Sequence, residues 1–496
     1  MTRSPAEGSG TADRLVSTDP HTGERLGDVP LRDTEAVESA VETARRAFAT
    51  WGGLPYGERR KHLLRWARLL ARRVDDLADL IHRENGKPHL DAVTEVLLAI
   101  THLRFAAKRA RRALRARRVS SGLFLNIRSR VSYSPMGVVA VIGPWNMPLF
   151  TPLGSIGPAL AAGNTVVFKP SELTPLVGQQ IEQTFAEAVP IPGVLQVVTG
   201  DGRTGEALAR AAVDKIAFTG SAAVGRKVMA TAADRLTPVV MELGGKDALV
   251  VAADADVTQA ARAAVWGAFM LSGQACISIE RAYVARPVYE RFVDAVVEEA
   301  RRVRPGSEAS AHIGAMTRPE QVDVVRDHLE DALRRGAKAV VGGPEAIAGR
   351  VLGPTVLVDV NEQMKVLSEE TFGPVLPIAR VEDVDEGIRR ANASEYGLGA
   401  AVFARSGARR LADRLECGMT SINSVAAFSA IPSLPFGGRG QSGFGRVHGQ
   451  HGLREFSQVK ATTELRFRLP VDLTAFQEQP EKVARWLRRA VLRWFG

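Results

Sequence analysis

The sequence predicts an α/β protein built on doubly wound, mostly parallel sheets. Between residues 138 and 218, short apolar strands alternate with helices, a pattern typical of a parallel sheet of the Rossmann, dinucleotide-binding type. A second α/β run begins near Asp247, and helical apolar spacing fills residues 35–118 ahead of the first strand. We therefore expect a domain boundary near residue 246.

The individual elements follow from apolar runs and turn residues. In the first run we expect strands at 138–142, 165–168, 195–198 and 215–218, and helices at 152–162, 175–188 and 204–211. In the second run the candidate strands are 248–251, 282–284, 339–341 and 421–423. Gly86-Lys87-Pro88 separates two early helices, and alternating apolar residues over 120–134 predict an extended ribbon.

Length, composition and charge limit the class of protein. The 496 residues are enough for about three domains and include no apolar run long enough to span a bilayer. Two cysteines and a polar N-terminus favour the reducing cytoplasm. The net charge of +10 comes largely from basic clusters at 104–118 and at the C-terminus. No nucleic-acid motif or metal-ligand spacing accompanies them, so we expect solvated helix faces and neither nucleic acid nor metal as a partner.

Cys276, in Gly273-Gln274-Ala275-Cys276, is the candidate nucleophile. It follows Glu242-Leu243-Gly244-Gly245-Lys246, whose carboxylate could serve as a base, and this combination suggests covalent thiol catalysis. A single cysteine is more often a small buried hydrophobe, and that interpretation suits Cys417. For Cys276, the other motifs described below favour a nucleophile over a buried structural cysteine.

Two segments predict a nucleotide site. At Phe218-Thr219-Gly220-Ser221 a strand leads into a helix, where Ser221 can cap the first turn and exposed amides can bind a pyrophosphate. Gly220 and Gly225 give only a loose version of the Rossmann glycine spacing. Lys169-Pro170-Ser171-Glu172 follows another strand, where Lys169 and Glu172 can bind ribose hydroxyls. Glu172 would repel a 2′-phosphate, which favours NAD over NADP.

Pro144-Trp145-Asn146 ends the strand at 138–142 and offers Asn146 as an oxyanion donor. Together with Glu369–Pro374 and Pro435–Gly438, all these motifs occur in the order and spacing of the aldehyde dehydrogenase superfamily, non-CoA-acylating branch, over roughly residues 15–460. The resemblance implies a Rossmann-type cofactor domain (1–118 and 136–246) and an α/β catalytic domain (247–450). It also implies a β-ribbon oligomerisation arm (119–135 and 451–467), followed here by a basic amphipathic extension (468–496).

The resemblance also implies a mechanism. Cys276 would attack the aldehyde to give a thiohemiacetal, whose oxyanion is held by the Cys276 backbone N–H and by Asn146. Hydride transfer to the nicotinamide would leave a thioester, and Glu242 would activate the water that hydrolyses it. The resemblance further implies that in this chain the cofactor would contact Trp145, Lys169, Glu172, Gly220, Ser221, Gly225, Leu243, Glu370 and Phe372.

The substrate is less narrowly defined by the sequence. Residues expected from the resemblance to line the aldehyde tunnel are apolar: Met147, Phe150, Met270, Ala275, Ile277, Phe428 and Phe436. An apolar lining favours an apolar aldehyde. The alternatives are a succinate-semialdehyde dehydrogenase, because Gly273–Arg281 resembles some enzymes of that name, an NADP-using relative, or a non-catalytic binding protein. Semialdehyde enzymes often place an arginine where this chain has Gly154, although Arg281 could compensate.

The C-terminal segment from Glu481 has the spacing of an amphipathic helix. Its apolar face would hold Val483, Trp486, Leu487, Ala490, Val491 and Trp494, opposite Lys482, Arg485, Arg488, Arg489 and Arg493. This pattern is typical of a helix lying on the inner membrane surface, or of one that docks on the protein or on a partner subunit. We expect a homodimer or homotetramer assembled through the ribbon at 120–134 and the C-terminal strand around residues 462–467.

Overall fold

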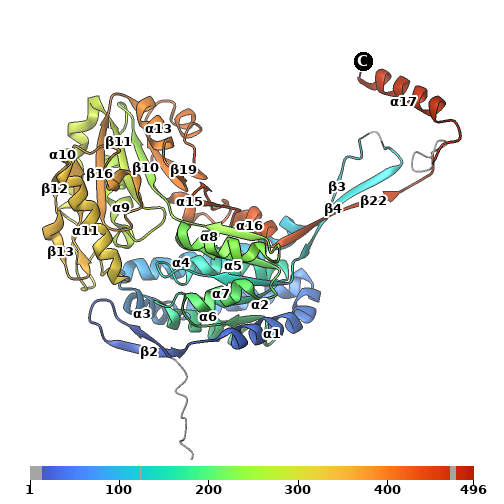
Figure 1. The fold of residues 1–496 in the computed structure, drawn as a ribbon, viewed down its shortest axis with the longest axis horizontal. Coiled ribbons are helices and arrows are strands. Elements are labelled where there is room, and N and C mark those ends of the chain that lie inside the picture. Colours follow the sequence, from blue (N-terminus) through green and yellow to red (C-terminus); the bar gives the residue numbers. More distant parts are fainter. Residues whose placement is uncertain (1–13, 123, 470–475, 496) are drawn as a thin grey trace, which may run out of the picture. The chain divides into compact units, whose positions relative to one another are not determined.

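The computed structural model describes residues 14–122, 124–469 and 476–495. The chain forms two compact units, one comprising residues up to Ala113 together with Pro135–Ser457, and the other Leu114–Ser134 together with the chain from Gln458 onward. The first unit contains two large sheets and most of the helices (Figure 1).

The first sheet has the strand order β21-β9-β8-β5-β6-β7. Its strands are β5 (Val138–Ile142), β6 (Thr165–Lys169), β7 (Leu195–Val197), β8 (Lys215–Thr219), β9 (Val239–Glu242) and β21 (Gly443–Phe444). Strands β5 to β9 are parallel, with β6 and β7 on one side of β5 and β8 and β9 on the other. The four predicted strands are confirmed, and the order reverses at β5, as in a doubly wound fold.

Helices surround this sheet. They are α1 (Thr34–Gly53), α2 (Tyr56–Arg72), α3 (Val74–Asn85), α4 (His89–Leu114), α5 (Phe150–Ala162), α6 (Pro175–Ala188), α7 (Gly202–Arg210) and α8 (Ala222–Ala233). Val41 of α1, Leu208 of α7 and Val228 of α8 share one buried cluster with alternate residues of β5 and β8. Gly86 ends α3 in the left-handed conformation, with φ of 84°, so the predicted break at this glycine is present. A hairpin of β1 (Arg14–Thr18) and β2 (Arg25–Pro30) precedes α1.

The second sheet has the order β12-β15-β16-β11-β10-β18-β19. Its strands are β10 (Asp247–Val251), β11 (Ile279–Ala285), β12 (Lys338–Val341), β15 (Thr355–Val358), β16 (Val375–Val381), β18 (Gly399–Phe403) and β19 (Met419–Ile422). Only the β12–β15 pair is antiparallel within this sheet. The predicted boundary near residue 246 falls between β9 of the first sheet and β10 of the second.

Alternate residues of the second sheet enter two separate cores, as the strand pleat requires. Leu249 and Val251 of β10 pack with α9 (Val257–Phe269) and α10 (Tyr289–Ala300). Ala248 and Val250 pack instead with α11 (Pro319–Arg334), α12 (Lys365–Ser368) and α13 (Val384–Asn392). Shorter elements complete the unit: η1 (Met270–Gly273), η2 (Arg286–Val288), η3 (Pro344–Ala346), β13 (Ile347–Ala348), β14 (Val351–Leu352), β17 (Tyr396–Gly397), β20 (Arg439–Gly440), α14 (Ala408–Ala412), α15 (Ala427–Ala430) and α16 (Gly449–Glu455).

The end of the predicted catalytic domain differs from the structure. We expected residues 247–450 to form one domain, but β21 pairs antiparallel with β9 in the first sheet. A Cβ built on Gly443 would lie 2.1 Å from the Met241 carbonyl oxygen, so this pairing requires glycine. The predicted start of the arm at residue 451 is also too early, because residues 449–455 form α16.

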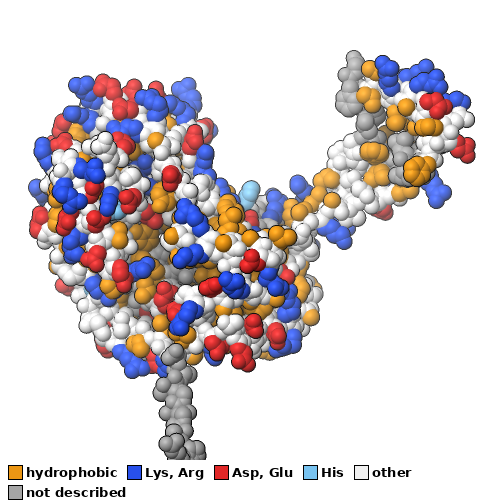
Figure 2. Space-filling model, in the orientation of Figure 1, with side chains coloured by type: hydrophobic (Ala, Val, Ile, Leu, Met, Phe, Trp, Pro, Cys, Tyr) orange, Lys and Arg blue, Asp and Glu red, His pale blue; other side chains and the backbone are white. Residues whose placement is uncertain are grey.

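The second unit contains a three-stranded sheet in the order β22-β4-β3. It comprises β3 (Arg117–Val119), β4 (Ile127–Pro135) and β22 (Ser457–Leu465), and the predicted ribbon at 120–134 is in part a turn. Helix α17 (Pro480–Phe495) follows and carries hydrophobic and basic side chains on its surface (Figure 2). The side chain of Trp494 lies outside the described residues. Nowhere in the described ranges is a helix both long and apolar enough to cross a membrane.

Candidate active site

A cavity of about 550 Å³ lies at the carboxyl ends of the first sheet's strands. Trp145 and Asn146 come from the loop after β5, Gly220 and Ser221 follow β8, and Glu242 ends β9. Strands β5 and β8 are neighbours at the point where the strand order reverses, which is where doubly wound sheets bind ligands. The volume suits a small molecule of ordinary size.

The cavity brings together most of the residues predicted from the sequence. Those that line it are Trp145, Asn146, Met147, Phe150, Gly220, Ser221, Glu242, Leu243, Met270, Ala275, Cys276, Ile277, Glu370, Phe372 and Phe436. Four predicted residues lie elsewhere: Lys169, Glu172, Gly225 and Phe428. The nucleophile, the oxyanion donor and the candidate base therefore share one cavity.

The four remaining residues have distinct positions. Lys169 ends β6 with its side chain buried and its Nζ 3.1 Å from Glu172, which is half exposed. Gly225 lies under Leu243, where a Cβ would be 2.7 Å from Leu243 Cδ2. Phe428, predicted to line the tunnel, is not among the residues that line this cavity. In the short helix α15 its neighbours Ala427 and Ser429 line the cavity, whereas Phe428 forms a buried cluster with Leu398 and Met419, against which Cys276, Ile277 and Phe436 pack.

Arg281 does not serve the cavity either, contrary to the possibility that it replaces an arginine at position 154. It is buried on β11, where its Nε donates to the Lys246 carbonyl at 2.8 Å and its Nη2 to the Ala391 carbonyl at 2.9 Å. Through these hydrogen bonds the guanidinium links the residue that precedes β10 to α13. The physical reason is direction, because Arg281 precedes Ala282, which faces the core on the other side of the strand.

Cys276 sits in a strained loop between α9 and β11. Leu271 and Ser272 have φ of 54° and 61°, and Gly273 has φ of 72°. A Cβ on Gly273 would lie 2.2 Å from the Gly373 backbone, so the loop can close only on glycine. The Cys276 thiol is free. Burial, followed by the nearby carboxylates of Glu370 and Asp247, raises its pKa above the ordinary value, so the thiol form is favoured in the protein alone.

Asn146 is held from two sides. Its side-chain Nδ2 donates to the Gln274 carbonyl at 2.9 Å, two residues before the nucleophile. Its backbone carbonyl accepts from the Lys87 Nζ at 2.6 Å, and the same Nζ pairs with Glu95 at 2.6 Å in a fully buried contact. One N–H of the amide is thus used for positioning, and the other remains to donate into the cavity.

Glu95 extends this support along the loop. Its second oxygen accepts from the backbone N–H groups of Leu149 and Phe150 at 2.8 and 3.0 Å. Asn85 Nδ2 also donates to the Trp145 carbonyl at 2.8 Å. The segment 145–150 is therefore fixed by buried charged and polar groups from α3, α4 and the turn between them, as a preorganised oxyanion site requires.

Glu242 is 5% exposed at the end of β9. Neither of its carboxylate oxygens has a hydrogen-bond partner among the described residues. Burial raises its pKa well above the ordinary value, opposed by the charge of Arg446. A Cβ on Gly437 would come within 2.8 Å of Oε1, so glycine is needed beside the carboxylate. An orphaned buried carboxyl group of this kind awaits a partner such as water or a ligand.

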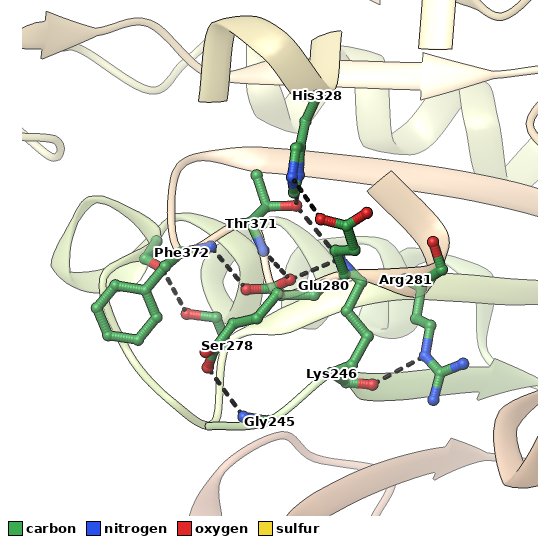
Figure 3. A network of polar contacts seen from close by, with 12 residues as sticks. Gly245, Lys246, Ser278, Glu280, Arg281, His328, Thr371 and Phe372 are labelled. Carbon is green, nitrogen blue, oxygen red and sulfur yellow. Dashed lines mark hydrogen bonds and ion pairs between the residues drawn. The ribbon is translucent and has the colours of Figure 1, made fainter. Parts of the chain in front are cut away.

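Glu370 and Phe372 are placed by a buried network around Glu280 (Figure 3). Glu280 accepts from the backbone N–H groups of Thr371 and Phe372 at 2.8 and 2.9 Å and pairs with Lys246 Nζ at 2.6 Å. The Gly245 N–H donates to Glu370 at 2.9 Å. The Phe372 ring then meets Trp145 edge-to-face, with ring centroids 5.5 Å apart.

Several residues of the cavity and its support were missed from the sequence. Asp91 and His448 line the cavity, and His102 packs against His448. Lys87, Glu95 and Glu280 hold the loops that carry lining residues. For Glu95 and His102 a signal existed, because both lie on the apolar face of α4 with Ala92, Val96 and Ala99. A charged residue on such a face usually has a buried partner. Lys87 was noticed only as part of a helix break, and Glu280 is one of seven fully buried positions of β11 with no visible pattern.

The family model described as the aldehyde dehydrogenase family matches residues 7–462. The chain belongs to the aldehyde dehydrogenase family. A 4,4'-diapolycopene aldehyde oxidase of Methylomonas sp is 40% identical over 461 residues, which is 92% of this chain and 87% of that protein. A glutarate-semialdehyde dehydrogenase of Pseudomonas aeruginosa is 37% identical over 89% of this chain and 92% of its own length.

Solved structures agree with this assignment. The NAD-dependent aldehyde dehydrogenase from Sinorhizobium meliloti superposes with a TM-score of 0.89 at 33% identity, covering 94% of each chain. The NADP-dependent glyceraldehyde-3-phosphate dehydrogenase from Bacillus halodurans, complexed with NADP, gives 0.88 at 34% identity, covering 92% of this chain and 97% of its own. The enzyme is thus an aldehyde dehydrogenase with the fold expected from its motifs.

Aldehyde dehydrogenases use NAD(P), and the residues present fit that cofactor. Ser221 caps the twelve-residue helix α8, its Oγ accepting from the Val224 N–H at 3.3 Å, which leaves first-turn amides for a pyrophosphate. The Trp145 and Phe372 rings and the Glu370 carboxylate line the same cavity. The Lys169–Glu172 pair lies at the carboxyl end of β6, next to β5.

Proposed function

We propose that the enzyme oxidises an apolar aldehyde to the free carboxylic acid with NAD⁺, through a covalent adduct on Cys276. The observation that carries this proposal is the convergence of Cys276, Asn146 and Glu242 on one cavity whose other lining side chains are mainly apolar, such as Met147, Phe150 and Phe436. The bound cofactor would supply the hydride acceptor. The protein's own residues would form the covalent adduct, stabilise the oxyanion and activate the hydrolytic water.

Those residues have separable roles. Cys276 would attack as the thiolate, after its proton has passed to water, and the Asn146 amide and the Cys276 backbone N–H would stabilise the oxyanion that forms when the sulfur adds to the carbonyl carbon. Glu242 would accept a proton from the water that attacks the resulting thioester, as its buried, unpartnered carboxyl group supports. Because Glu242 is present, hydrolysis to free acid is expected rather than transfer to CoA.

NAD is the proposed preference because Glu172 lies beside Lys169 at the edge where the ribose would bind. A 2′-phosphate would meet the Glu172 carboxylate and be repelled. Kinetics with hexanal, benzaldehyde and succinate semialdehyde, each with NAD⁺ and NADP⁺, test both substrate and cofactor. Hexanal with NAD⁺ should give the highest kcat/KM, and no aldehyde-dependent NADH formation with any of them would refute the proposal.

The assembly and location of the enzyme are also proposals. A homodimer or homotetramer through the β22-β4-β3 arm is supported by the exposed residues along β22, whose edge can pair with another chain. The cytoplasmic location expected from two free cysteines stays a prediction. Light scattering of the full chain would give the oligomeric state, and a monomer would contradict the proposed role of the arm.

Helix α17 supports contact with an anionic membrane surface. Trp486 and Val491 of its apolar face are exposed, at 52% and 44%, and the helix also carries Arg485, Arg488, Arg489 and Arg493. Sedimentation with anionic vesicles, with and without residues 470–496, is the test. Equal sedimentation of the two forms would exclude the membrane role, and a change of oligomeric state on truncation would instead favour docking on a partner subunit.

A further inference from the structure

His448 forms one wall of the cavity together with two phenylalanines, and the ring of His102 packs against it. The rings of His102 and His448 have centroids 4.3 Å apart, and the His448 ring lies 5.5 Å from both Phe150 and Phe436. His448 and both phenylalanines line the cavity. His448 is 6% exposed, and its Nδ1 is buried without a hydrogen-bond partner in the described chain.

The backbone of His448 adopts a conformation that side chains avoid. It stands just before α16 with φ of 61° and ψ of 173°, a region populated almost only by glycine. The conformation is held by its neighbours, since the Gly449 N–H donates to the Pro432 carbonyl at 3.1 Å and the Gly452 N–H to the His448 carbonyl at 2.7 Å. Strain of this kind is retained where it places a side chain at a functional site.

The imidazole occupies the space that a side chain on α5 would take. A Cβ built on Gly154 would lie 2.6 Å from His448 Nε2, which is closer than real Cβ contacts allow. Helix α5 therefore contributes no side chain at this position, and His448 forms the wall instead. Any longer residue at position 154 would require His448 to move.

The charges around the cavity do not suit an anionic substrate. Burial lowers the pKa of both His102 and His448, so both rings are neutral. Among the described residues that line the cavity, Arg318 is the sole lysine or arginine, and it is exposed and bonded to Glu320 at 3.2 Å. Apart from His448 and the Cys276 thiol, the other ionisable lining groups are the acids Asp91, Glu242 and Glu370.

We infer that His448 determines the substrate class: its uncharged imidazole, standing where Gly154 leaves room, selects aldehydes with an apolar tail and rejects semialdehydes that end in a carboxylate. A carboxylate at this wall would lose its hydration without gaining a cation. The inference rests on the proposed function, because it concerns the substrate of that same site.

The test compares hexanal with succinate semialdehyde, which has the same number of non-hydrogen atoms. For the full-length wild-type enzyme we expect kcat/KM to favour hexanal by about 100-fold or more. In His448→Gly, which also relieves the backbone strain, we expect this preference to fall by about 10-fold. Gly154→Arg alone should impair the oxidation of hexanal, since the arginine and His448 compete for one space, and His448→Gly combined with Gly154→Arg should favour succinate semialdehyde.

His451→Ala is the matched control, because His451 lies three residues further on, in α16, and is exposed. The substrate preference of this variant should equal that of the wild type. Oxidation of hexanal and succinate semialdehyde at similar kcat/KM by the wild type would overturn the inference, as would an unchanged preference in His448→Gly. If the wild type oxidises neither aldehyde, the proposed function itself fails. Should the double variant not fold, the wild type and His448→Gly still decide the question.

Discussion

The Lys87 ammonium donates a hydrogen bond of 2.6 Å to the backbone carbonyl of Asn146, from a position that is almost completely buried. The same nitrogen pairs with Glu95, which in turn accepts the N–H groups of Leu149 and Phe150. A single buried ion pair thus couples α4 to the loop that holds the oxyanion donor. Both the stability of the fold and the rate of catalysis should therefore depend on the Lys87–Glu95 ion pair.

Replacing Lys87 by methionine should lower both properties. The change leaves Glu95 buried without its cation, so we expect the free energy of unfolding to drop by about 3–5 kcal/mol. Denaturant unfolding measures this loss. The double variant Lys87→Met with Glu95→Leu should recover part of the stability but not kcat, because the Asn146 carbonyl still lacks its donor. A fully active Lys87→Met enzyme would contradict the positioning role.

Asn146→Ala removes one of the two proposed oxyanion donors. We expect kcat to fall by about 100-fold to 1000-fold. Because Asn146 is assigned to the oxyanion and not to the nucleotide, the dissociation constant for NAD⁺, measured by titration calorimetry, should stay within the error of the wild type. A comparable loss in NAD⁺ binding would instead show a structural role for this side chain.

Glu242→Gln should separate the two halves of the reaction. The first turnover of NADH should still appear as a burst in stopped-flow absorbance, whereas the steady-state rate falls by about 100-fold or more because no base activates water. Glu382→Gln, on an exposed acid, is the control and should behave as the wild type does. Loss of the burst together with the steady state would mean that Glu242 acts before the thioester forms.

Asp247 predicts a pH dependence of stability. Burial raises its pKa from 3.8 to about 8, so the folded protein holds this proton more tightly than the unfolded chain does. Its contribution to stability is complete below the unfolded pKa and is lost as the pH rises through the folded value. In Asp247→Asn the free energy of unfolding should therefore fall less steeply between about pH 4 and pH 8. If the free energy of unfolding falls with pH as steeply in Asp247→Asn as in the wild type, other groups cause the pH dependence.

Local patterns were enough to predict four strands in each of the two sheets, whereas β9, β15, β16, β18 and β21 were not predicted. Helix α6 begins at Pro175 and ends at Ala188 as expected, because proline at its first position and regular apolar spacing act within the segment itself. Cys276, Asn146 and Glu242 were found through short motifs that recur at fixed spacing. These motifs predict which residues share the active site, but they do not predict the buried residues that hold those side chains in place.

What could not be predicted depends on contacts between distant segments. His448 lies beside Gly154 across nearly three hundred residues of chain, and no local signal announces either the positive φ or the missing side chain. The sequence does not show which way Phe428 faces, because one turn of helix gives no periodicity from which to choose a face. Arg281 was assigned a possible role from its charge alone, whereas its direction on β11 commits it to backbone carbonyls.

The central claim is that Cys276 forms the covalent intermediate, and mass spectrometry of a trapped adduct tests it most directly. Glu242→Gln enzyme mixed with hexanal and NAD⁺ and then quenched should carry a hexanoyl group on the peptide that contains Cys276. The same mixture with Cys276→Ala should show neither adduct nor NADH. A hexanoyl group on Cys417, or NADH formed at the wild-type rate by Cys276→Ala, would contradict the account.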